Sequence, residues 1–411
     1  MDKLTAMQII QSVSSGVPNS EHVLDYTAPR RFEQPPLKEM CGHLDNVRQG
    51  LSMVHFINGD YGEGKSHTLA VLRKLALDRK FVVSQLALEV RGVRFDMMER
   101  VFARMVETLS CDDCTAPGKT VLEQIIDRWG RQRKNIERDL DEIGLDPTLP
   151  DLKNAVVCWA RIMRGEEPRE AAGVDRVELL RRWFMPAGAN LTAKERRLIN
   201  VFNNISAGNA RQMIEGLAVL FRGFGQAGWL VLIDEQEIVP TLLTTRQRSL
   251  CNQNLRVIVD SVNQSMPPRG MYYVFASGTE FFTDPDRGIN TYPALRDRIK
   301  SNAVLKLPKM DYEEMVEVGR RLVSIAQSAE PESQVSALLT EPVIREFIVR
   351  LQKRYGALGY KVRGFVQALV NLARQAGQEK AEHISALMDP ILEKTFQSIG
   401  DQISSAERGK P

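Results

Sequence analysis

The sequence predicts an α/β protein in which helices cover both faces of a parallel sheet. Three observations lead to this class. Short apolar segments alternate with helical patterns before residue 110 and again after residue 208, which is typical of parallel strands joined by helical crossovers. A glycine-rich loop joins the first apolar segment to a helix, and a later segment ends in two carboxylates. In such folds a ligand binds where the strands end.

Composition sets limits on function. The 411 residues, 43% hydrophobic and 26% charged, suit a soluble globular protein of about two or three domains. The formal charge of +3 gives no general case for nucleic acid or a membrane surface, so any DNA contact must be local. There is no run of 18 apolar residues and no signal-peptide pattern. We therefore expect a cytoplasmic protein without a membrane partner.

Residues 1–50 are predicted to form a helical segment of their own. Leu4, Met7, Ile10 and Val13 follow helical spacing, and the pattern ends at Gly16. After a proline-rich passage, residues 37–47 predict a second helix that covers the first strand.

A phosphate-binding loop follows the predicted strand 53–57. Its sequence is Gly59-Asp60-Tyr61-Gly62-Glu63-Gly64-Lys65-Ser66, and a helix begins near His67. Strand, G-x-x-x-x-G-K-[ST] and helix together let backbone N–H groups surround an anion at a helix N-terminus. Lys65 would reach the β- and γ-phosphates, and Ser66 would ligate Mg²⁺.

A second strand, 81–88, and a helix, 95–109, continue the pattern, which lapses between 110 and 208. We interpret 110–208 as an inserted, mostly helical subdomain whose charges nearly cancel, so it is either a solvated surface or a local nucleic-acid site. The better candidate for the latter is the set of basic residues interleaved with aromatic ones, namely Arg176, Arg181, Arg182, Trp183 and Phe184.

The five cysteines are scattered and odd in number, so they predict reduced thiols. Cys111 and Cys114 have the spacing of a zinc knuckle, but no second ligand pair follows, which favours an incidental loop pair.

Residues 229–234 form an apolar strand that ends in Asp234 and Glu235, after a helix at 213–224. In a protein with a phosphate loop, the first acid holds Mg²⁺ and the second polarises the attacking water as a general base.

The next strand, 271–276, is preceded by a helix at 247–262 and followed by Ser277 and Thr279. A hydroxyl at the end of the neighbouring strand could bond the attacking water or the γ-phosphate. Ser277 is the first choice and Thr279 the second, and the alternative is that both only cap a turn. A strand at 304–307 would close the nucleotide-binding domain, 51–308, and residues 309–411 predict an all-α domain opened by the capping signature Asp311 to Glu314.

This order of motifs resembles the AAA+ ATPases, near the initiator branch. The resemblance implies an α-helical lid over a parallel-sheet nucleotide-binding domain and assigns a sensor to Ser277 or Thr279. It assigns an arginine finger that acts on a neighbouring subunit to Arg298, with Arg296 as second choice, and a second sensor to Arg363 in Gly359-Tyr360-Lys361-Val362-Arg363. A finger acting in trans implies an oligomer with ATP at subunit interfaces.

The chain is more closely similar to the ATP-binding proteins of BREX phage-resistance systems. The similarity lies in the phosphate loop, in the strand ending Asp234-Glu235-Gln236-Glu237, and in Phe275 to Phe282 followed by Tyr292-Pro-Ala-Leu-Arg-Asp-Arg. It implies an accessory ATPase of antiviral defence, encoded with a helicase-like partner and acting on DNA. Glu237 adds a third acid beside the pair, which leaves open which carboxylate polarises water.

Two functions follow from these motifs. The first is an ATPase, with ATP and Mg²⁺ as cofactors, that couples nucleotide state to assembly on DNA or to a partner enzyme. The second is an oligomeric scaffold that binds nucleotide with negligible turnover, and Glu235 favours the first because a scaffold needs no general base. ATP would be held by residues 59–67 and Arg363, Mg²⁺ by Ser66 and Asp234, and catalysis would use Glu235, Arg298, Ser277 and Thr279.

Overall fold

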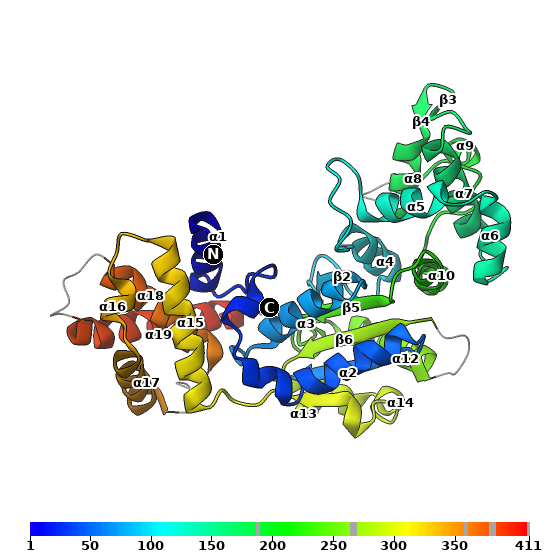
Figure 1. Cartoon of the computed structure of the whole chain (residues 1–411). Coiled ribbons are helices and arrows are strands. Elements are labelled where there is room, and N and C mark those ends of the chain that lie inside the picture. Colours follow the sequence, from blue (N-terminus) through cyan, green and yellow to red (C-terminus); the bar gives the residue numbers. More distant parts are fainter. Residues whose placement is uncertain (186–189, 264–268, 357–360, 378–383, 409–411) are drawn as a thin grey trace.

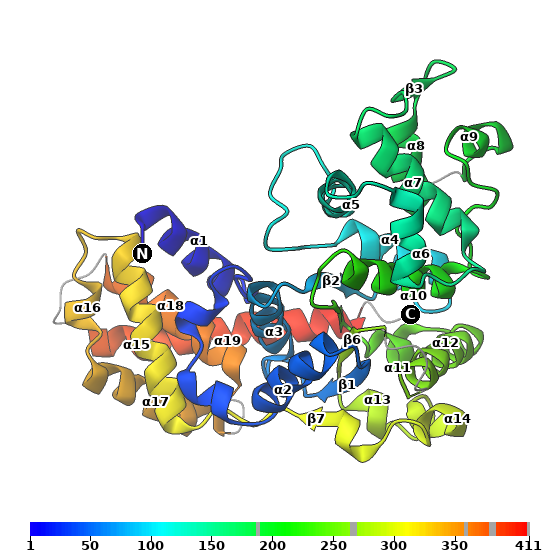
Figure 2. The same ribbon diagram turned by 45° about the vertical axis from the view of Figure 1, so that its right-hand side comes forward.

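The computed structural model describes residues 1–185, 190–263, 269–356, 361–377 and 384–408. Figure 1 shows a central sheet domain, with the C-terminal helices on one side and an inserted subdomain, coloured cyan to green, on the other. Figure 2 gives the same arrangement from a second direction.

The central sheet has five strands, all parallel, in the order β2-β5-β6-β1-β7. They are β1 (Met53–Asn58), β2 (Val82–Ala87), β5 (Trp229–Asp234), β6 (Met271–Ser277) and β7 (Val304–Lys306). Because β6 lies between β1 and β5, Ser277 pairs in register with Asn58, and the ends of all three strands meet at one edge. The α/β class with a parallel sheet is confirmed.

Helices cover the sheet on both faces. On one face α2 (Leu37–Arg48) and α3 (Lys65–Asp78) pack over alternate strand residues such as Ile57, Leu232 and Val274. On the other face α4 (Met98–Glu107), α10 (Ala210–Gly223) and α12 (Thr245–Asn263) pack over Phe56 and Phe275. Burial on both faces explains why β5 and β6 are apolar without alternation.

The insertion between α4 and α10 consists mainly of helices. These are α5 (Val121–Arg131), α6 (Ile136–Ile143), α7 (Pro150–Met163), α8 (Arg176–Phe184) and α9 (Ala193–Leu198). A short hairpin of β3 (Glu170–Ala171) and β4 (Val174–Asp175) interrupts them, which the sequence did not predict. The apolar core of the insertion is continuous with the core on the α4 face of the sheet, so the insertion is anchored to the sheet domain.

The C-terminal residues form an all-α domain, as predicted. Its helices are α15 (Tyr312–Ala329), α16 (Val335–Leu338), α17 (Glu341–Tyr355), α18 (Val362–Ala376) and α19 (Ile384–Arg408). Asp311 caps α15 by accepting from Glu314 N–H at 2.8 Å. The Glu314 carboxylate is buried and pairs with Arg31 instead of completing the capping box. This ion pair joins the C-terminal domain to the N-terminal segment.

The N-terminal segment is divided between the two domains. Helix α1 (Lys3–Ser14) buries Ala6, Ile9, Ile10 and Val13 in the core of the C-terminal helices, whereas α2 packs on the sheet. Gln367 of α18 donates to the Ser14 carbonyl at 3.1 Å. Two short 3₁₀ helices, η1 (Val23–Tyr26) and η2 (Pro29–Glu33), connect α1 to α2. Among the described helices, none combines the length and apolar sequence needed to cross a membrane.

Candidate nucleotide-binding site

The glycine-rich loop has the backbone geometry of an anion site. It leaves the carboxyl end of β1, and α3 begins at Lys65 directly after it. Gly62 and Gly64 have φ angles of 81° and 99°, in the left-handed region that favours glycine. The loop is tied to the neighbouring strand because Gly59 N–H donates to the Ser277 carbonyl at 3.2 Å. The first N–H groups of α3 therefore point into a preformed concavity at a helix N-terminus.

Two carboxylates contact donors of the phosphate loop. The Lys65 ammonium is buried, donates to the Gly59 carbonyl at 2.9 Å and lies 3.3 Å from Glu237 Oε1. Glu63 Oε2 accepts from Asp60 N–H at 2.7 Å. The sequence identified Glu237 as an extra acid, but it did not predict the contact with Lys65.

The two predicted metal ligands are in direct contact. Ser66 Oγ donates to Asp234 Oδ2 at 2.7 Å, across the gap between α3 and the end of β5. A hydroxyl and a single carboxylate suit Mg²⁺, which keeps several waters and takes few protein oxygens. The described residues contain no group of three or more His, Cys, Asp or Glu side chains that could hold a metal ion. The hydroxyl of Ser66 and the carboxylate of Asp234 fit magnesium bound together with a phosphate ligand.

Glu235 lies beside this pair in a strained backbone conformation. Its φ of 63° is uncommon for a residue with a side chain. Burial, followed by the nearby charges of Glu237 and Asp234, raises the pKa of Glu235 to about 7, while Lys65 and Arg363 oppose the shift. A carboxyl group with this pKa is suited to exchange a proton near neutral pH.

The end of β6 places one of the two candidate hydroxyls on the loop. Thr279 Oγ1 donates to Asp60 Oδ1 at 2.7 Å and lies 3.2 Å from Asn58 Oδ1. Thr279 precedes α13 (Glu280–Thr283) but makes no side-chain capping bond. Ser277 is fully buried, and its Oγ has no hydrogen-bond partner in the described part of the chain. Of the two hydroxyls, that of Thr279 is thus the one that bonds the phosphate loop, whereas Ser277 contacts the loop only through its backbone carbonyl.

The start of α18 reaches the same loop from the C-terminal domain. Arg363 N–H donates to the Gly62 carbonyl at 3.2 Å, and its guanidinium lies 5.0 Å from the centre of the Tyr61 ring. Lys361 Nζ donates to the Tyr61 carbonyl at 3.0 Å. Gly359 and Tyr360, which precede this segment in the motif, lie outside the described residues. Arg363 is thereby brought to the site that contains Lys65 and Glu235.

A cavity lies between the phosphate loop, the N-terminal segment and the C-terminal helices. Its empty space, including the part open to solvent, is about 1210 Å³. Away from the loop its wall is mainly apolar, with Val13, Val17, Pro18, Tyr26, Ala28, Leu37, Met310, Val318, Val362 and Val366. An apolar compartment beside a phosphate site suits the flat base of a nucleotide.

His67 also lines this cavity, where it holds the N-terminal segment. Its Nε2 is 2.9 Å from Thr27 Oγ1, and its ring lies 5.6 Å from that of Tyr26. Burial, with a smaller effect of the Arg31 charge, lowers the pKa of His67 to about 4. His67 is therefore a neutral packing residue between α3 and the N-terminal segment near pH 7.

The two arginines proposed as fingers lie elsewhere. Arg298, just after α14 (Pro293–Arg296), donates from Nε to Asp260 Oδ1 at 2.5 Å and from Nη1 to the Ala294 carbonyl at 2.6 Å. It lines a hollow together with residues 52–56 at the amino end of β1, opposite the end that carries the phosphate loop. Arg296 pairs with Asp297. The structure does not bring either arginine to the cavity of its own chain.

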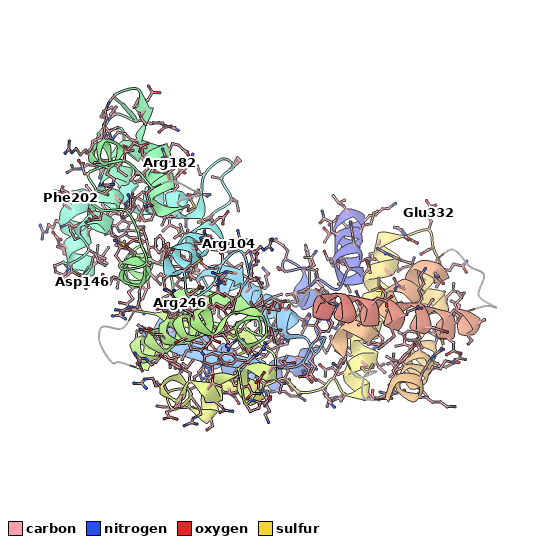
Figure 3. The ribbon with its side chains drawn as sticks, turned by 180° about the vertical axis from the view of Figure 1, so that it is seen from behind. Arg104, Asp146, Arg182, Phe202, Arg246 and Glu332 are labelled. Carbon is pink, nitrogen blue, oxygen red and sulfur yellow. The ribbon has the colours of Figure 1, made fainter. Side chains whose placement is uncertain are left out.

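The basic and aromatic cluster of the insertion is not a stacking surface, so choosing it as the better candidate for a nucleic-acid site was wrong. Trp183 and Phe184 are 2% and 0% exposed, and Trp183 Nε1 donates to the Asn203 carbonyl. The arginines are paired with carboxylates: Arg176 with Glu167, Arg181 with Glu123 and Arg182 with Glu195. Figure 3 shows Arg182 on the insertion, with the exposed Phe202 on the same subdomain.

Comparison with known families gave a match over most of the chain. The family model described as BREX system ATP-binding protein BrxC/D matches residues 2–157 and 130–390. The two matched ranges overlap within the insertion and together include the phosphate loop, the acid pair and Arg363. No curated protein matched the chain. The family match extends over most of the sequence, and the chain therefore belongs to the family of BREX system ATP-binding proteins.

Proposed function

We propose that this chain is a magnesium-dependent ATPase of a bacterial antiviral defence system. The nucleotide that it binds controls its assembly and its action on DNA or on a helicase-like partner. The observation that carries the proposal is the contact between Ser66 and Asp234 beside Glu235. Ser66 and Asp234 are the two proposed ligands of the magnesium ion, and Glu235 is a carboxylate suited to general-base catalysis. All three lie at the edge of the sheet where the loop would bind phosphate.

Each residue has a role that its contacts support. Lys65 and the loop N–H groups bind the β- and γ-phosphates, and Ser66 with Asp234 holds Mg²⁺, which neutralises phosphate charge. Glu235 accepts the proton of the attacking water, and Thr279 fixes the loop end of β6 through Asp60. Arg363 carries a positive charge from α18 to the phosphates, so nucleotide binding draws the C-terminal helices toward the loop.

Nucleotide binding replaces the two internal carboxylates. Glu237 on Lys65 and Glu63 on Asp60 N–H occupy the donors that the phosphates need. Phosphate oxygens carry more charge than a carboxylate and make strong charge-assisted bonds to the same donors. The exchange therefore moves Glu237 away from Lys65 and links occupancy of the site to the segment that follows β5.

The remaining part of the proposal concerns partners. Arg298 lies opposite the phosphate loop of its own chain, a position from which it can serve the site of a neighbouring subunit. The assembly then has ATP at subunit interfaces and acts in the cytoplasm on DNA or through a partner enzyme.

A scaffold that binds nucleotide without significant turnover is the second candidate. The ion pair between Arg298 and Asp260 favours it, because a guanidinium held within its own chain contributes nothing to a neighbour. In this alternative ATP stabilises the oligomer, and Glu235 has no catalytic task.

The deciding experiment measures phosphate release against protein concentration, with and without single-stranded and double-stranded DNA. The wild type is compared with Glu235→Gln, which should bind ATP without hydrolysing it. Turnover that depends on Glu235 and increases with concentration supports the ATPase. Tight ATP binding with equal, minimal release by both proteins supports the scaffold.

A further inference from the structure

A turn with two thiols lies between the sheet domain and the insertion. It is formed by residues 111–114, after α4 and before α5, and Cys114 N–H donates to the Cys111 carbonyl at 3.2 Å. A β-turn brings its first and last Cα atoms within about 7 Å. Disulfides bridge Cα atoms about 4.4–6.8 Å apart. The turn therefore already holds the two cysteines at a separation that suits a bond between them.

The two thiols differ in acidity. A hydrogen bond from Cys114 lowers the pKa of Cys111 to about 7, with a smaller contribution from the Arg128 charge. The same bond raises the pKa of Cys114. Arg128 Nη2 is 3.8 Å from Cys114 Sγ and donates to the Asp113 carbonyl at 2.7 Å, so the guanidinium also fixes the turn. This asymmetry gives one thiol that attacks and one that resolves.

The other cysteines lack these features. Burial raises the pKa of Cys41, of Cys158 to about 11 and of Cys251 to about 12. Cys158 and Cys251 are also buried, whereas Cys111 and Cys114 are both partly exposed. Reactivity toward a disulfide requires a thiolate that the reagent can reach. Residues 111–114 combine both properties, and Cys41 has only the second.

We propose that Cys111 and Cys114 form a reversible thiol–disulfide exchange site that reacts with low-molecular-weight disulfides such as oxidised glutathione. The Cys111 thiolate attacks one sulfur of the disulfide and releases one thiolate, which leaves a mixed disulfide on Cys111. The Cys114 thiolate then attacks Cys111 Sγ, expels the second thiolate and closes the internal disulfide. One disulfide is reduced to two thiols while the cysteine pair is oxidised, and reduced glutathione reverses both steps.

The position of the turn connects this chemistry to the nucleotide site. Ser110, the preceding residue, exchanges two backbone hydrogen bonds with Val83 of β2, at 2.7 and 2.9 Å. Its hydroxyl accepts from Arg73 Nη2 at 3.0 Å, and Arg73 belongs to α3, the helix that begins at Lys65. Closing the disulfide thus constrains a residue that is bonded both to the sheet and to the phosphate-loop helix.

The test uses the full chain equilibrated with mixtures of oxidised and reduced glutathione, quenched by acid and analysed by mass spectrometry. The wild type should lose two thiols per chain without retaining glutathione, and reduction should reverse this. Cys114→Ser should accumulate glutathione on Cys111, because the resolving thiol is missing. Cys111→Ser should react at least several-fold more slowly. Cys41→Ser is the matched control and should behave like the wild type.

Three results would overturn the proposal. The first is a wild type that keeps both thiols free when oxidised glutathione is in large excess. The second is stable glutathione adducts on Cys111 with Cys114 present, since the internal bond then fails to close. The third is stoichiometric binding of Zn²⁺ that requires both cysteines and blocks their oxidation, because the pair would then be part of a metal site.

Discussion

The carboxylate of Glu237 contacts two parts of the proposed catalytic site. Its Oε1 lies 3.3 Å from Lys65 Nζ, and its Oε2 accepts from Gly278 N–H at 3.1 Å, directly after β6. It is also, after burial, the largest cause of the raised pKa of Glu235. One side chain therefore balances the charge of the phosphate-binding lysine and makes the proposed base harder to ionise.

Replacing Glu237 with glutamine should change the dependence of the ATPase rate on pH. The base is active only when ionised, so the wild-type kcat/KM, which reports ionisations of the free enzyme, should rise through about pH 7, the pKa of Glu235. Without the negative charge of Glu237, Glu235 ionises more easily, and the midpoint should move to lower pH. The affinity for ATP should increase because Lys65 loses its internal partner.

The measurement is kcat/KM between about pH 5.5 and 9, where the ionisation of Glu235 in the free enzyme is resolved. Glu280→Gln is a suitable control, since Glu280 also follows β6 but is not among the causes of the Glu235 shift. An unchanged midpoint in Glu237→Gln would show that Glu237 does not act on the base.

Lys65 and Glu235 should separate binding from turnover. Lys65→Ala removes a buried ammonium from the loop and should abolish ATP binding. Glu235→Gln keeps the shape of the site and should stop hydrolysis while ATP still binds. Titration with a fluorescent ATP analogue and phosphate release measure the two properties. Equal loss of affinity in both variants would contradict the roles assigned to them.

The sequence could predict the position of those residues that follow from local pattern, whereas their roles remain predictions. Lys65, Ser66, Asp234 and Glu235 each sit at a fixed offset from a strand end, so their meeting follows from a parallel sheet. The contact of Glu237 with Lys65 depends on the path of the chain after β5, into α11 (Ile238–Leu242), which local pattern does not specify. Trp183 was wrongly predicted to be exposed, because an aromatic residue beside arginines has the same local sequence pattern whether it is buried or exposed.

At the scale of elements, α18 is the connection between the C-terminal helices and the phosphate loop. Arg363 N–H, in its first turn, donates to the Gly62 carbonyl, and Lys361, the residue before the helix, donates from Nζ to the Tyr61 carbonyl. The rest of the helix packs with α1 and α15 in a separate core. A movement of the loop on binding ATP would therefore act on the C-terminal helices through α18.

Arg363→Ala should weaken ATP binding. A hydrogen bond to a charged group contributes about 1.5–3 kcal/mol, so Kd should increase by about 10- to 150-fold. Arg320→Ala is the control, because Arg320 is exposed on α15 and pairs with Glu317 of the same helix. Isothermal titration calorimetry with ATP gives the Kd of both variants. If Arg363→Ala binds as tightly as Arg320→Ala, Arg363 does not contact the phosphates.

Most elements could be predicted from periodicity, but their arrangement could not. The order β2-β5-β6-β1-β7 places β6 between β1 and β5, and lateral order depends on packing between distant segments. The hairpin β3–β4 was missed because its turn is Ala172-Gly173, with φ angles of 52° and 74°. Asparagine or aspartate before glycine is the recognisable signal for that turn, and alanine is not.

The whole molecule should lose stability in mild acid because it buries neutral histidines. Burial lowers the pKa of His55 to about 4, with a further effect of the stacked His43, and burial lowers that of His67 to about 4. An unfolded chain binds these protons near pH 6.5. Between about pH 6.5 and 4 the unfolded state therefore holds more protons, and stability falls as the pH falls.

Urea unfolding at several pH values between about 5 and 7.5 checks this expectation, above the range in which most carboxylates titrate. The free energy of unfolding should depend less steeply on pH in His55→Gln and in His67→Gln than in the wild type. Glu235, whose pKa is raised to about 7, has the opposite effect on stability in this range, so the test is the comparison with the variants. An unchanged dependence on pH in both histidine variants would contradict the burial of neutral histidines.

Assembly is the property of the whole molecule on which the role of Arg298 depends. Arg298 lies at the end of the sheet opposite the phosphate loop and is held by Asp260 of α12. If it completes the site of a neighbour, it must exchange Asp260 for phosphate when subunits associate. Arginines that act in trans contribute about 10³ to 10⁵ in rate where they have been measured.

Mixing two inactive variants tests this directly. Arg298→Ala keeps an intact phosphate loop, and Lys65→Ala keeps an intact Arg298, so a mixed assembly contains some complete sites and should regain part of the activity. Wild-type activity per subunit should rise over the concentrations at which sedimentation shows association. Asp260→Asn releases Arg298 from its internal partner and should increase activity at a given concentration. If the variants never complement and activity per subunit is constant while the mass increases from monomer to oligomer, the site is complete within one chain. The pair of Arg298 with Asp260 then serves only to hold the segment after α14 against α12.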